Sequence, residues 1–272
     1  MNRREFIRWV VRGAVGACLF DASVIEPHLI KWNTFSLDSR RQKNTPLTLV
    51  QLSDLHLRKI DRTLIKLAED INKLKPDILC LTGDAVDRPR YLPVLDEYLG
   101  MIDRNIPKFS ILGNWEYWGG VDLSALKETY EKYGWQLLVN ESVICSLQEK
   151  SILITGLDDF IGGDPDIGSA LKQIPNHDFH VVLSHCPEFR DVLVNFFPHF
   201  SSMDVVLSGH THGGQVNLLG FIPVLPPGSG RYVKGWYKEK PPAMYVSSGI
   251  GTSLLPLRMG VLPEVTVFRM NV

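Results

Sequence analysis

The sequence lacks the cysteine spacing, the charge excess and the repeats that would mark several common classes of protein. Its four cysteines form no CxxC or CxxxC pair, which argues against a zinc knuckle or a disulfide framework. The formal net charge of the 272 residues is −1, so the overall charge does not favour nucleic acid as a partner. With 44% hydrophobic and 22% charged residues, the composition is that of one sizeable globular domain.

Residues 1–30 differ from the rest of the chain. They begin MNRREFIRWVVR, with four arginines against one glutamate, and the apolar stretch that follows is interrupted by Arg12 and Asp21. That stretch is too short and too polar to predict a membrane-spanning helix. The paired arginines followed by Phe6 resemble a twin-arginine export signal, with Asn2 where Ser or Thr is usual. We predict an export signal or membrane anchor, and hence a membrane-associated or periplasmic protein. The alternative is a basic amphipathic tail on the cytoplasmic face of the inner membrane.

Residues 31–46 are polar and aperiodic, and we predict a linker that ends at Pro46. Beyond it, residues 47–272 contain short apolar runs rich in Val, Ile and Leu, each bounded by Pro, Gly, Asp or Asn, as is typical of buried strands. These runs cover residues 47–53, 77–83, 108–113, 151–156, 180–185, 204–209, 243–248 and 264–268.

Helical patterns lie between several of these runs. One keeps three-four spacing from Leu64 to Leu74, with Asp61 placed to cap its start and Pro76 to stop it. The alternation of strand and helix predicts an α/β architecture with helices outside the sheet layers. The final third has fewer helical patterns, so we expect part of the sheet to be antiparallel.

Polar side chains follow five of the predicted strands at the point where each strand ends. The carboxyl ends of parallel strands meet at one edge of a sheet, where ligands bind. All of these residues offer N or O ligands that suit divalent metals. They are Asp54, His56, Asp84, Asn114, His185, His210 and His212. Each alone has an ordinary explanation as a cap or turn residue. Together they predict a metal centre, because so many polar groups at one edge cost desolvation unless a cation compensates.

The blocks that hold these residues also resemble a known family. LSDLH, LTGDAVD, LGNWE, LSH and LSGHTHGGQ, in this order, are similar to the five signature blocks of the calcineurin-like metallophosphoesterase superfamily. The resemblance covers residues 47–272, and the end of the chain resembles a bacterial branch that carries twin-arginine signals. It implies an α/β fold of two face-to-face mixed β-sheets flanked by helices, in four layers.

The resemblance further implies two divalent metal ions, which the sequence does not identify among manganese, iron and zinc. Asp54, His56 and His212 would hold the first ion. Asn114, His185 and His210 would hold the second, and Asp84 would bridge the two. Asp84, Asn114 and His185 are the residues we expect to be most important for catalysis. A hydroxide between the two cations would attack the phosphorus.

Two neighbouring carboxylates are candidates for a supporting role. We expect Asp87 and Glu116 to orient ligating histidines by accepting their free N–H groups. The alternative for each is an ordinary turn or helix N-terminal carboxylate.

Trp115 departs from the family pattern. Most members have a histidine at this position, which is thought to protonate the leaving group, and an indole cannot act as a general acid. Three consequences stay open at this point. The leaving group needs no acid, as in a phosphoanhydride or an aryl ester; another group such as His180 takes the role; or turnover is weak.

We therefore predict a metallophosphoesterase that cleaves a phosphoester or phosphoanhydride at or near a membrane. Its substrate would be a phosphorylated small molecule or a lipid-linked compound, and we expect no nucleic-acid partner. One alternative is a UDP-2,3-diacylglucosamine-type pyrophosphohydrolase of lipid A synthesis, because such family members also lack the histidine. Another is a weakly active metal-binding scaffold. Residues 195–200 and 218–237, rich in aromatics and prolines, either meet a lipid or pack over the sheet edge.

Overall fold

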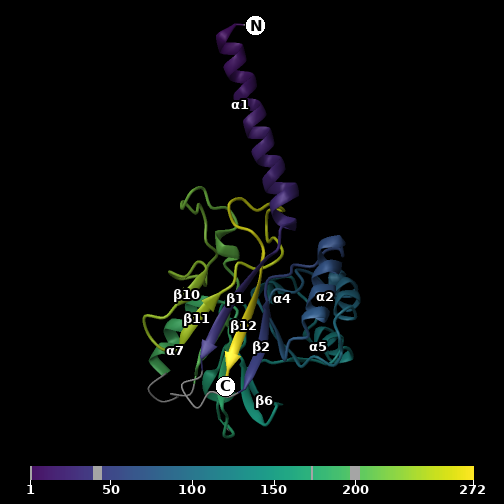
Figure 1. Ribbon diagram of the computed structural model, residues 1–272, viewed down its shortest axis with the longest axis vertical. Coiled ribbons are helices and arrows are strands. Elements are labelled where there is room, and N and C mark those ends of the chain that lie inside the picture. Colours follow the sequence, from purple (N-terminus) through teal and green to yellow (C-terminus); the bar gives the residue numbers. More distant parts are fainter. Residues whose placement is uncertain (1, 39–44, 173, 197–202) are drawn as a thin grey trace.

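Two β-sheets pack face to face, with helices on their outer faces (Figure 1). The computed structural model describes residues 2–38, 45–172, 174–196 and 203–272. In these residues each sheet has six strands, and each mixes parallel with antiparallel neighbours. The predicted fold class, a sandwich of two mixed sheets flanked by helices, is confirmed.

The first sheet has the strand order β1-β12-β2-β3-β4-β5. Strands β2 to β5 are parallel to one another, and β12 is antiparallel to β2. Its strands are β1 (Lys31–Asp38), β2 (Pro46–Leu52), β3 (Ile78–Thr82), β4 (Lys108–Ile111), β5 (Trp135–Leu137) and β12 (Glu264–Asn271).

The second sheet has the order β10-β11-β9-β8-β7-β6. Its four central strands are parallel, and antiparallel strands close both edges. Its strands are β6 (Glu141–Leu147), β7 (Lys150–Gly156), β8 (Phe179–Leu183), β9 (Val205–Ser208), β10 (Gly235–Tyr237) and β11 (Ala243–Val246).

Helices cover the two outer faces, and Figure 1 shows α2 and α5 on one side of the molecule and α7 on the other. The helices are α1 (Arg3–Phe20), α2 (Arg62–Leu74), α3 (Leu92–Leu99), α4 (Asn114–Trp118), α5 (Leu123–Lys132), α6 (Ile167–Ala170) and α7 (Arg190–Phe196). The predicted helix start is confirmed, because the Asp61 side chain accepts hydrogen bonds from the backbone N–H groups of Thr63 and Leu64. Lys75 ends α2 in a left-handed conformation directly before Pro76.

The central strands are buried on both faces, which explains their continuous apolar sequence. In β3, Leu79 and Leu81 pack with the helices outside the first sheet, whereas Ile78 and Cys80 face the second sheet. A third apolar cluster lies between the second sheet and helices α6 and α7 and includes Leu193. These three cores hold both sheets rigidly, so the loops at the strand ends have a fixed base.

The linker predicted for residues 31–46 is wrong for its first half. Lys31–Asp38 form β1, which pairs in parallel with β12 along its whole length. Their polar sequence is compatible with this place because β1 lies at the edge of the sheet and half of it faces solvent. Residues 39–44 lie outside the described residues.

Helix α1 extends away from the sandwich (Figure 1), and none of its residues is buried. Asn2 caps it in a reciprocal arrangement with Glu5. Directly after the helix the chain joins the domain, where the backbone N–H of Arg258 donates to the carbonyl of Ala22. Among the described residues, no helix is long and apolar enough to cross a membrane.

Candidate metal centre

All seven predicted ligands come together between the two sheets, at the carboxyl ends of the parallel strands. They follow β2, β3 and β4 in the first sheet and β8 and β9 in the second. All of them are buried. The amide of Gln51 links the two sheets beneath the site by donating to the carbonyl of Ser208 at 2.9 Å. The side chains thus converge because both sheets present the same end of their parallel strands to one place.

The ligand atoms form two adjacent groups. Asp54, His56 and His212 form one, and Asp84, His185 and His210 form the other, with the ligand atoms of each group within 4.8 Å of one another. The amide oxygen of Asn114 belongs with the second group, because it lies 2.9 Å from His210 Nδ1 and 3.2 Å from His185 Nε2.

Asp84 connects the two groups. Its Oδ2 atom lies 3.6 Å from His56 Nε2 in the first group and 3.2 Å from His185 Nε2 in the second. Its other oxygen, Oδ1, accepts the backbone N–H of Trp115 at 2.9 Å. One oxygen is therefore fixed by the protein, and the other points between the two groups.

The backbone at the site is strained. Left-handed conformations are uncommon for residues other than glycine, and they concentrate at functional sites. Five of the seven candidate ligands have a φ between 43° and 72°: Asp54, His56, Asp84, His210 and His212. The well-packed strands hold these turns in place, and the strain is itself evidence that the positions serve a function.

Glycines next to the ligands allow close approach of backbone and side chains. A Cβ atom on Gly113 would lie 2.3 Å from Asp84 Oδ1, and one on Gly209 would lie 2.4 Å from Asp54 Oδ2. Any side chain at either position would push these carboxylates out of place.

Three of the four histidines among the candidate ligands use one ring nitrogen to contact an acceptor of the protein, which leaves the other nitrogen for the centre. His56 Nδ1 contacts the carboxylate of Asp87. His185 Nδ1 lies 2.7 Å from the carbonyl of Thr82, and His210 Nε2 lies 2.6 Å from that of Pro227. Such contacts fix the tautomer and the orientation of a ligating imidazole. The contact that was predicted between Asp87 and a candidate ligand histidine is thus present.

The protonation states of His212 and Asp84 suit metal binding. Burial lowers the pKa of His212 well below its ordinary value, and the charges of His56 and Arg258 add to this effect, so that imidazole is neutral. Burial alone would raise the pKa of Asp84, but attraction to His185 and His56 holds it below its ordinary value, so this carboxylate is ionised. Neutral imidazole and ionised carboxylate are the forms that bind cations. Burial alone would lower the pKa of His56 and His185, but Asp87 beside His56 and Asp84 beside both raise it, so these two rings would release a proton when a cation binds. The donor set therefore fits a pair of divalent metals.

The expectation that Glu116 orients a histidine is wrong. Its carboxylate instead accepts backbone N–H groups from Gly113 and from the turn after β3, including Ala85 at 2.6 Å. Further backbone donors are Asp84 at 3.2 Å and Val86 at 3.3 Å. Burial, together with the negative charge of Asp84, raises the pKa of Glu116 to about 8. Glu116 therefore ties the Asp84 turn to the Asn114 turn, and it supports the centre through the backbone.

His180, one candidate for the missing acid, does not lie at the centre. It is in β8, five residues before His185, and its Nε2 contacts the hydroxyl of Thr155 at 2.8 Å. Five residues of extended strand span about 16 Å. His180 is therefore a buried residue of the second sheet. It does not supply the proton donor that is missing because residue 115 is a tryptophan.

An apolar cavity of about 510 Å³ opens from the centre. Asp84, Asn114, His210 and His212 contribute to its floor, and residues 223–227 contribute to its wall. Other apolar lining residues are Trp115, Trp118, Leu254 and Leu255.

The expectation that residues 218–237 pack over the sheet edge is wrong for several large side chains, because Leu219, Phe221 and Val224 are strongly exposed. Residues 197–200 of the other aromatic segment lie outside the described residues.

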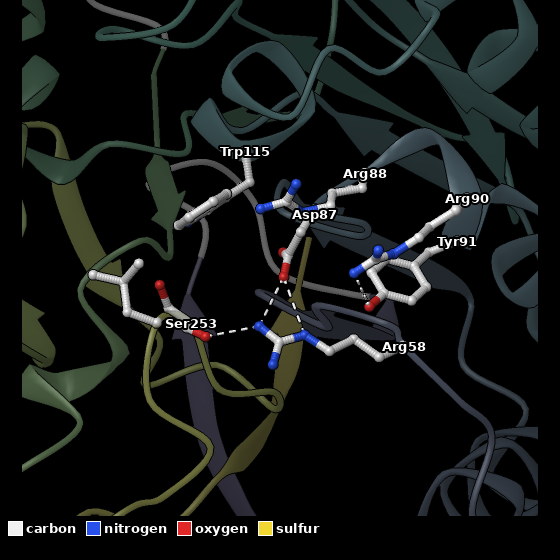
Figure 2. A pocket seen from close by; sticks show the side chains of 8 residues that line it. Arg58, Asp87, Arg88, Arg90, Tyr91, Trp115 and Ser253 are labelled. Carbon is white, nitrogen blue, oxygen red and sulfur yellow. Dashed lines mark hydrogen bonds and ion pairs between the residues drawn. The ribbon is translucent and has the colours of Figure 1, made fainter.

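A second, basic pocket of about 230 Å³ lies beside Trp115 (Figure 2). Arg58, Arg88 and Arg90 line it. Arg58 donates to the Asp87 carboxylate at 2.9 Å, so this pocket is connected to His56 through Asp87. Arg58 is distant in the sequence from Arg88 and Arg90, which lie together in a turn. No sequence pattern therefore identified the three arginines as one site.

Arg258 is another residue that sequence reasoning missed. It is fully buried, and its Nη2 atom lies 3.4 Å from His212 Nδ1. The same atom donates to the carbonyls of Ser248 and Gly251, which fixes the closing segment over the centre. Within the described residues its Nη1 atom has no hydrogen-bond partner. The sequence signal that could have pointed to Arg258 is its place as a lone charged residue in the apolar segment LLPLRMGVL.

Comparisons with known proteins agree with this geometry. The family model described as calcineurin-like phosphoesterase matches residues 47–214. The uncharacterized metallophosphoesterase YkuE of Bacillus subtilis (strain 168) is 30% identical, over 100% of this chain and 98% of that protein. The phosphodiesterase YaeI of Escherichia coli (strain K12) is 29% identical, over 83% of this chain and 82% of that protein. This chain belongs to the calcineurin-like phosphoesterase family and is a metallophosphoesterase.

Proposed function

We propose that the chain hydrolyses a phosphodiester or a phosphoanhydride at a centre of two divalent cations. The observation that carries this proposal is the position of Asp84 Oδ2, which lies within 3.6 Å of histidine nitrogens from both ligand groups. A carboxylate oxygen in that place suits a bridge between two cations. Two cations held close together activate a water molecule and stabilise the charge that develops on phosphoryl oxygens.

Each ligand group has its own role in this proposal. Asp54, His56 and His212 would hold one cation, and Asn114, His185 and His210 the other. The protein fixes the orientation of the rings through their second nitrogens, and Glu116 and the strand-end glycines keep the turns close together. Manganese, iron and zinc all suit a set of imidazole, carboxylate and amide ligands.

Trp115 favours a substrate with a good leaving group. It stands at the rim of the centre, with its ring 6.3 Å from that of His56. Its indole N–H does not titrate, so it cannot protonate a departing alkoxide. Aryl esters and phosphoanhydrides release anions that are stable without protonation. The name of the relative YaeI, a phosphodiesterase, also supports a diester.

A second candidate is the hydrolysis of the pyrophosphate of a UDP-2,3-diacylglucosamine-type lipid. The cavity supports it, because Val224, Leu254 and Leu255 offer an apolar surface for acyl chains directly beside the cations. This candidate differs from the first in its product, since it would release UMP.

Membrane contact through residues 1–30 is part of the proposal. Helix α1 exposes Phe6 and Trp9 together with four arginines, a combination that suits the surface of an anionic bilayer. The end of α1 joins the domain at Arg258, next to His212, so a membrane-bound helix would keep the centre near lipid. The Arg3-Arg4 pair supports delivery by a twin-arginine signal.

A substrate panel tests the activity. Full-length protein is loaded with Mn²⁺, Fe²⁺ or Zn²⁺ and offered bis(p-nitrophenyl) phosphate, p-nitrophenyl phosphate and UDP-2,3-diacylglucosamine. We expect cleavage of the diester or release of UMP from the lipid, abolished by EDTA and restored by metal. Failure of every metal form on every substrate would overturn the proposed function.

Vesicle sedimentation tests the membrane contact. Full-length protein should sediment with vesicles that contain phosphatidylglycerol and remain in solution with pure phosphatidylcholine. The variant Phe6→Glu/Trp9→Glu should lose this binding, whereas Ile65→Glu, which changes an exposed apolar residue of α2, should keep it. Equal binding of both variants would contradict a role for α1.

A further inference from the structure

The basic pocket carries an excess of positive charge that its own residues do not neutralise. Its lining contains three guanidinium groups, from Arg58, Arg88 and Arg90, and one carboxylate, Asp87, which leaves two positive charges. Asp87 is already engaged by Arg58 and His56. The chain as a whole has a net charge of −1, so this excess is local.

Arg88 and Arg90 are the two arginines available to a ligand. Both are exposed, and Arg88 has no ion-pair partner among the residues that the structure describes. Arg90 lies over the ring of Tyr91 and donates to its hydroxyl at 3.0 Å, which holds the guanidinium in place. In Figure 2 the Arg88 side chain points toward the ring of Trp115.

The position of the pocket joins it to the metal centre. Trp115, Ser253 and Leu254 line both the basic pocket and the apolar cavity. Arg58 donates to the carbonyl of Ser253 at 2.8 Å, which fixes this shared wall. A single molecule with one phosphate at Asp84 and Asn114 can therefore extend past Trp115 toward the arginines.

We propose that Arg88 and Arg90, supported by Arg58, bind a second phosphate of the substrate, so that the substrate is a bisphosphorylated ester with an apolar leaving group. This inference rests on the proposed function and adds the identity of the group beyond the scissile phosphate. Guanidinium groups bind phosphate through paired, charge-assisted hydrogen bonds. The apolar cavity on the other side of Trp115 takes the leaving group.

A binding experiment tests the subsite without turnover. Thymidine 3′,5′-bisphosphate and thymidine 5′-monophosphate are titrated into full-length, manganese-loaded protein by calorimetry. We expect the bisphosphate to bind about 10- to 100-fold more tightly, from one or two charge-assisted contacts. The variant Arg88→Gln/Arg90→Gln should lose this preference. The control variant Arg62→Gln/Arg104→Gln removes the same charge from exposed positions elsewhere and should keep it.

Equal affinity of the two nucleotides, or an unchanged preference in Arg88→Gln/Arg90→Gln, would overturn the proposal. A cleavage experiment adds a second readout with the 5′-p-nitrophenyl ester of thymidine 5′-phosphate, with and without a 3′-phosphate. The wild type should have the higher kcat/KM for the bisphosphate, mainly through KM. Lack of cleavage of both esters, with the binding preference intact, would count against the proposed function and leave the subsite supported.

Discussion

The metal centre and the rim around it are built in opposite ways. The centre is buried, and its carboxylates and imidazoles are held by several protein contacts each, on a strained backbone between two rigid sheets. The rim is exposed and is formed by loops: residues 218–227, the segment around Leu254, and the turn that carries Arg88 and Arg90.

This difference separates the reaction from the choice of substrate. Ligand positions within a packed core tolerate little displacement, because a shift of one turn changes the distances between all donor atoms. Loops on a fixed scaffold can vary without loss of the fold. We therefore infer that the centre sets the two-metal chemistry shared with the family, and that Trp115, the arginines and the apolar loops set what is cleaved.

The change expected to break the centre most severely is Asp84→Asn. It alters the carboxylate whose Oδ2 atom lies between the two ligand groups, so we expect a loss of kcat of about 10³-fold or more on bis(p-nitrophenyl) phosphate at saturating metal. Asp70→Asn, which alters a half-buried aspartate of α2 away from the centre, is the control and should retain full activity. An Asp84→Asn enzyme with near-normal kcat would show that the bridge is not needed.

Removal of a supporting group should weaken the centre less. In Asp87→Asn the His56 ring loses its carboxylate partner, so we expect about a 10- to 100-fold weaker affinity for metal. Competition with a chelator measures this affinity directly. Asp87 also pairs with Arg58, so Arg58→Gln serves as a control that leaves the His56 contact in place. Equal metal affinity in Asp87→Asn and the wild type would mean that the contact does not support the centre.

The rim is probed by Trp115→His. An imidazole here restores a proton donor, so hydrolysis of an alkyl ester with a poor leaving group should rise, by up to about 10²-fold. An aryl diester should respond much less because its leaving group needs no proton. Trp115→Phe controls for loss of the indole. A similar response of both substrates to Trp115→His would contradict the leaving-group explanation.

The smallest expected effect is a change in the acid sensitivity of folding stability when His180, a buried histidine away from the centre, is replaced. Burial lowers its pKa to about 3, and the charge of His177 adds to this. The unfolded chain has a histidine pKa of about 6.5, so between pH 6.5 and 3 the unfolded state binds more protons and acid destabilises the fold. In His180→Gln this part of the acid sensitivity should disappear. Urea unfolding at pH 7 and pH 4.5 measures the change, and an unaltered pH dependence would refute it.

Much of the fold and the arrangement of the centre could be predicted from the sequence. The strands that carry the site are continuous apolar runs because both of their faces are buried, and each ends in a polar ligand at the same edge. Strand β1 was missed because its polar residues are stabilised by pairing with β12, more than 200 residues away in the chain. Short edge strands such as Trp135–Leu137 and Gly235–Tyr237 carry too few residues to show a pattern.

The rim was much less predictable than the centre. Glu116 was recognised as a supporting residue, but its partners are backbone N–H groups, which have no sequence signal. Arg58 and Arg88 share a pocket only because β2 and β3 are neighbours in the sheet. Arg258 reaches His212 through a loop that follows the last strand of the second sheet.

Metal content tests the central claim most directly. Purified protein is freed of metal, reloaded with manganese and analysed by mass spectrometry while its diesterase activity is measured. We predict two ions per chain in the active protein, and fewer in a His56→Ala/His185→Ala variant with no activity. Full activity with one ion per chain or none would contradict the two-metal centre.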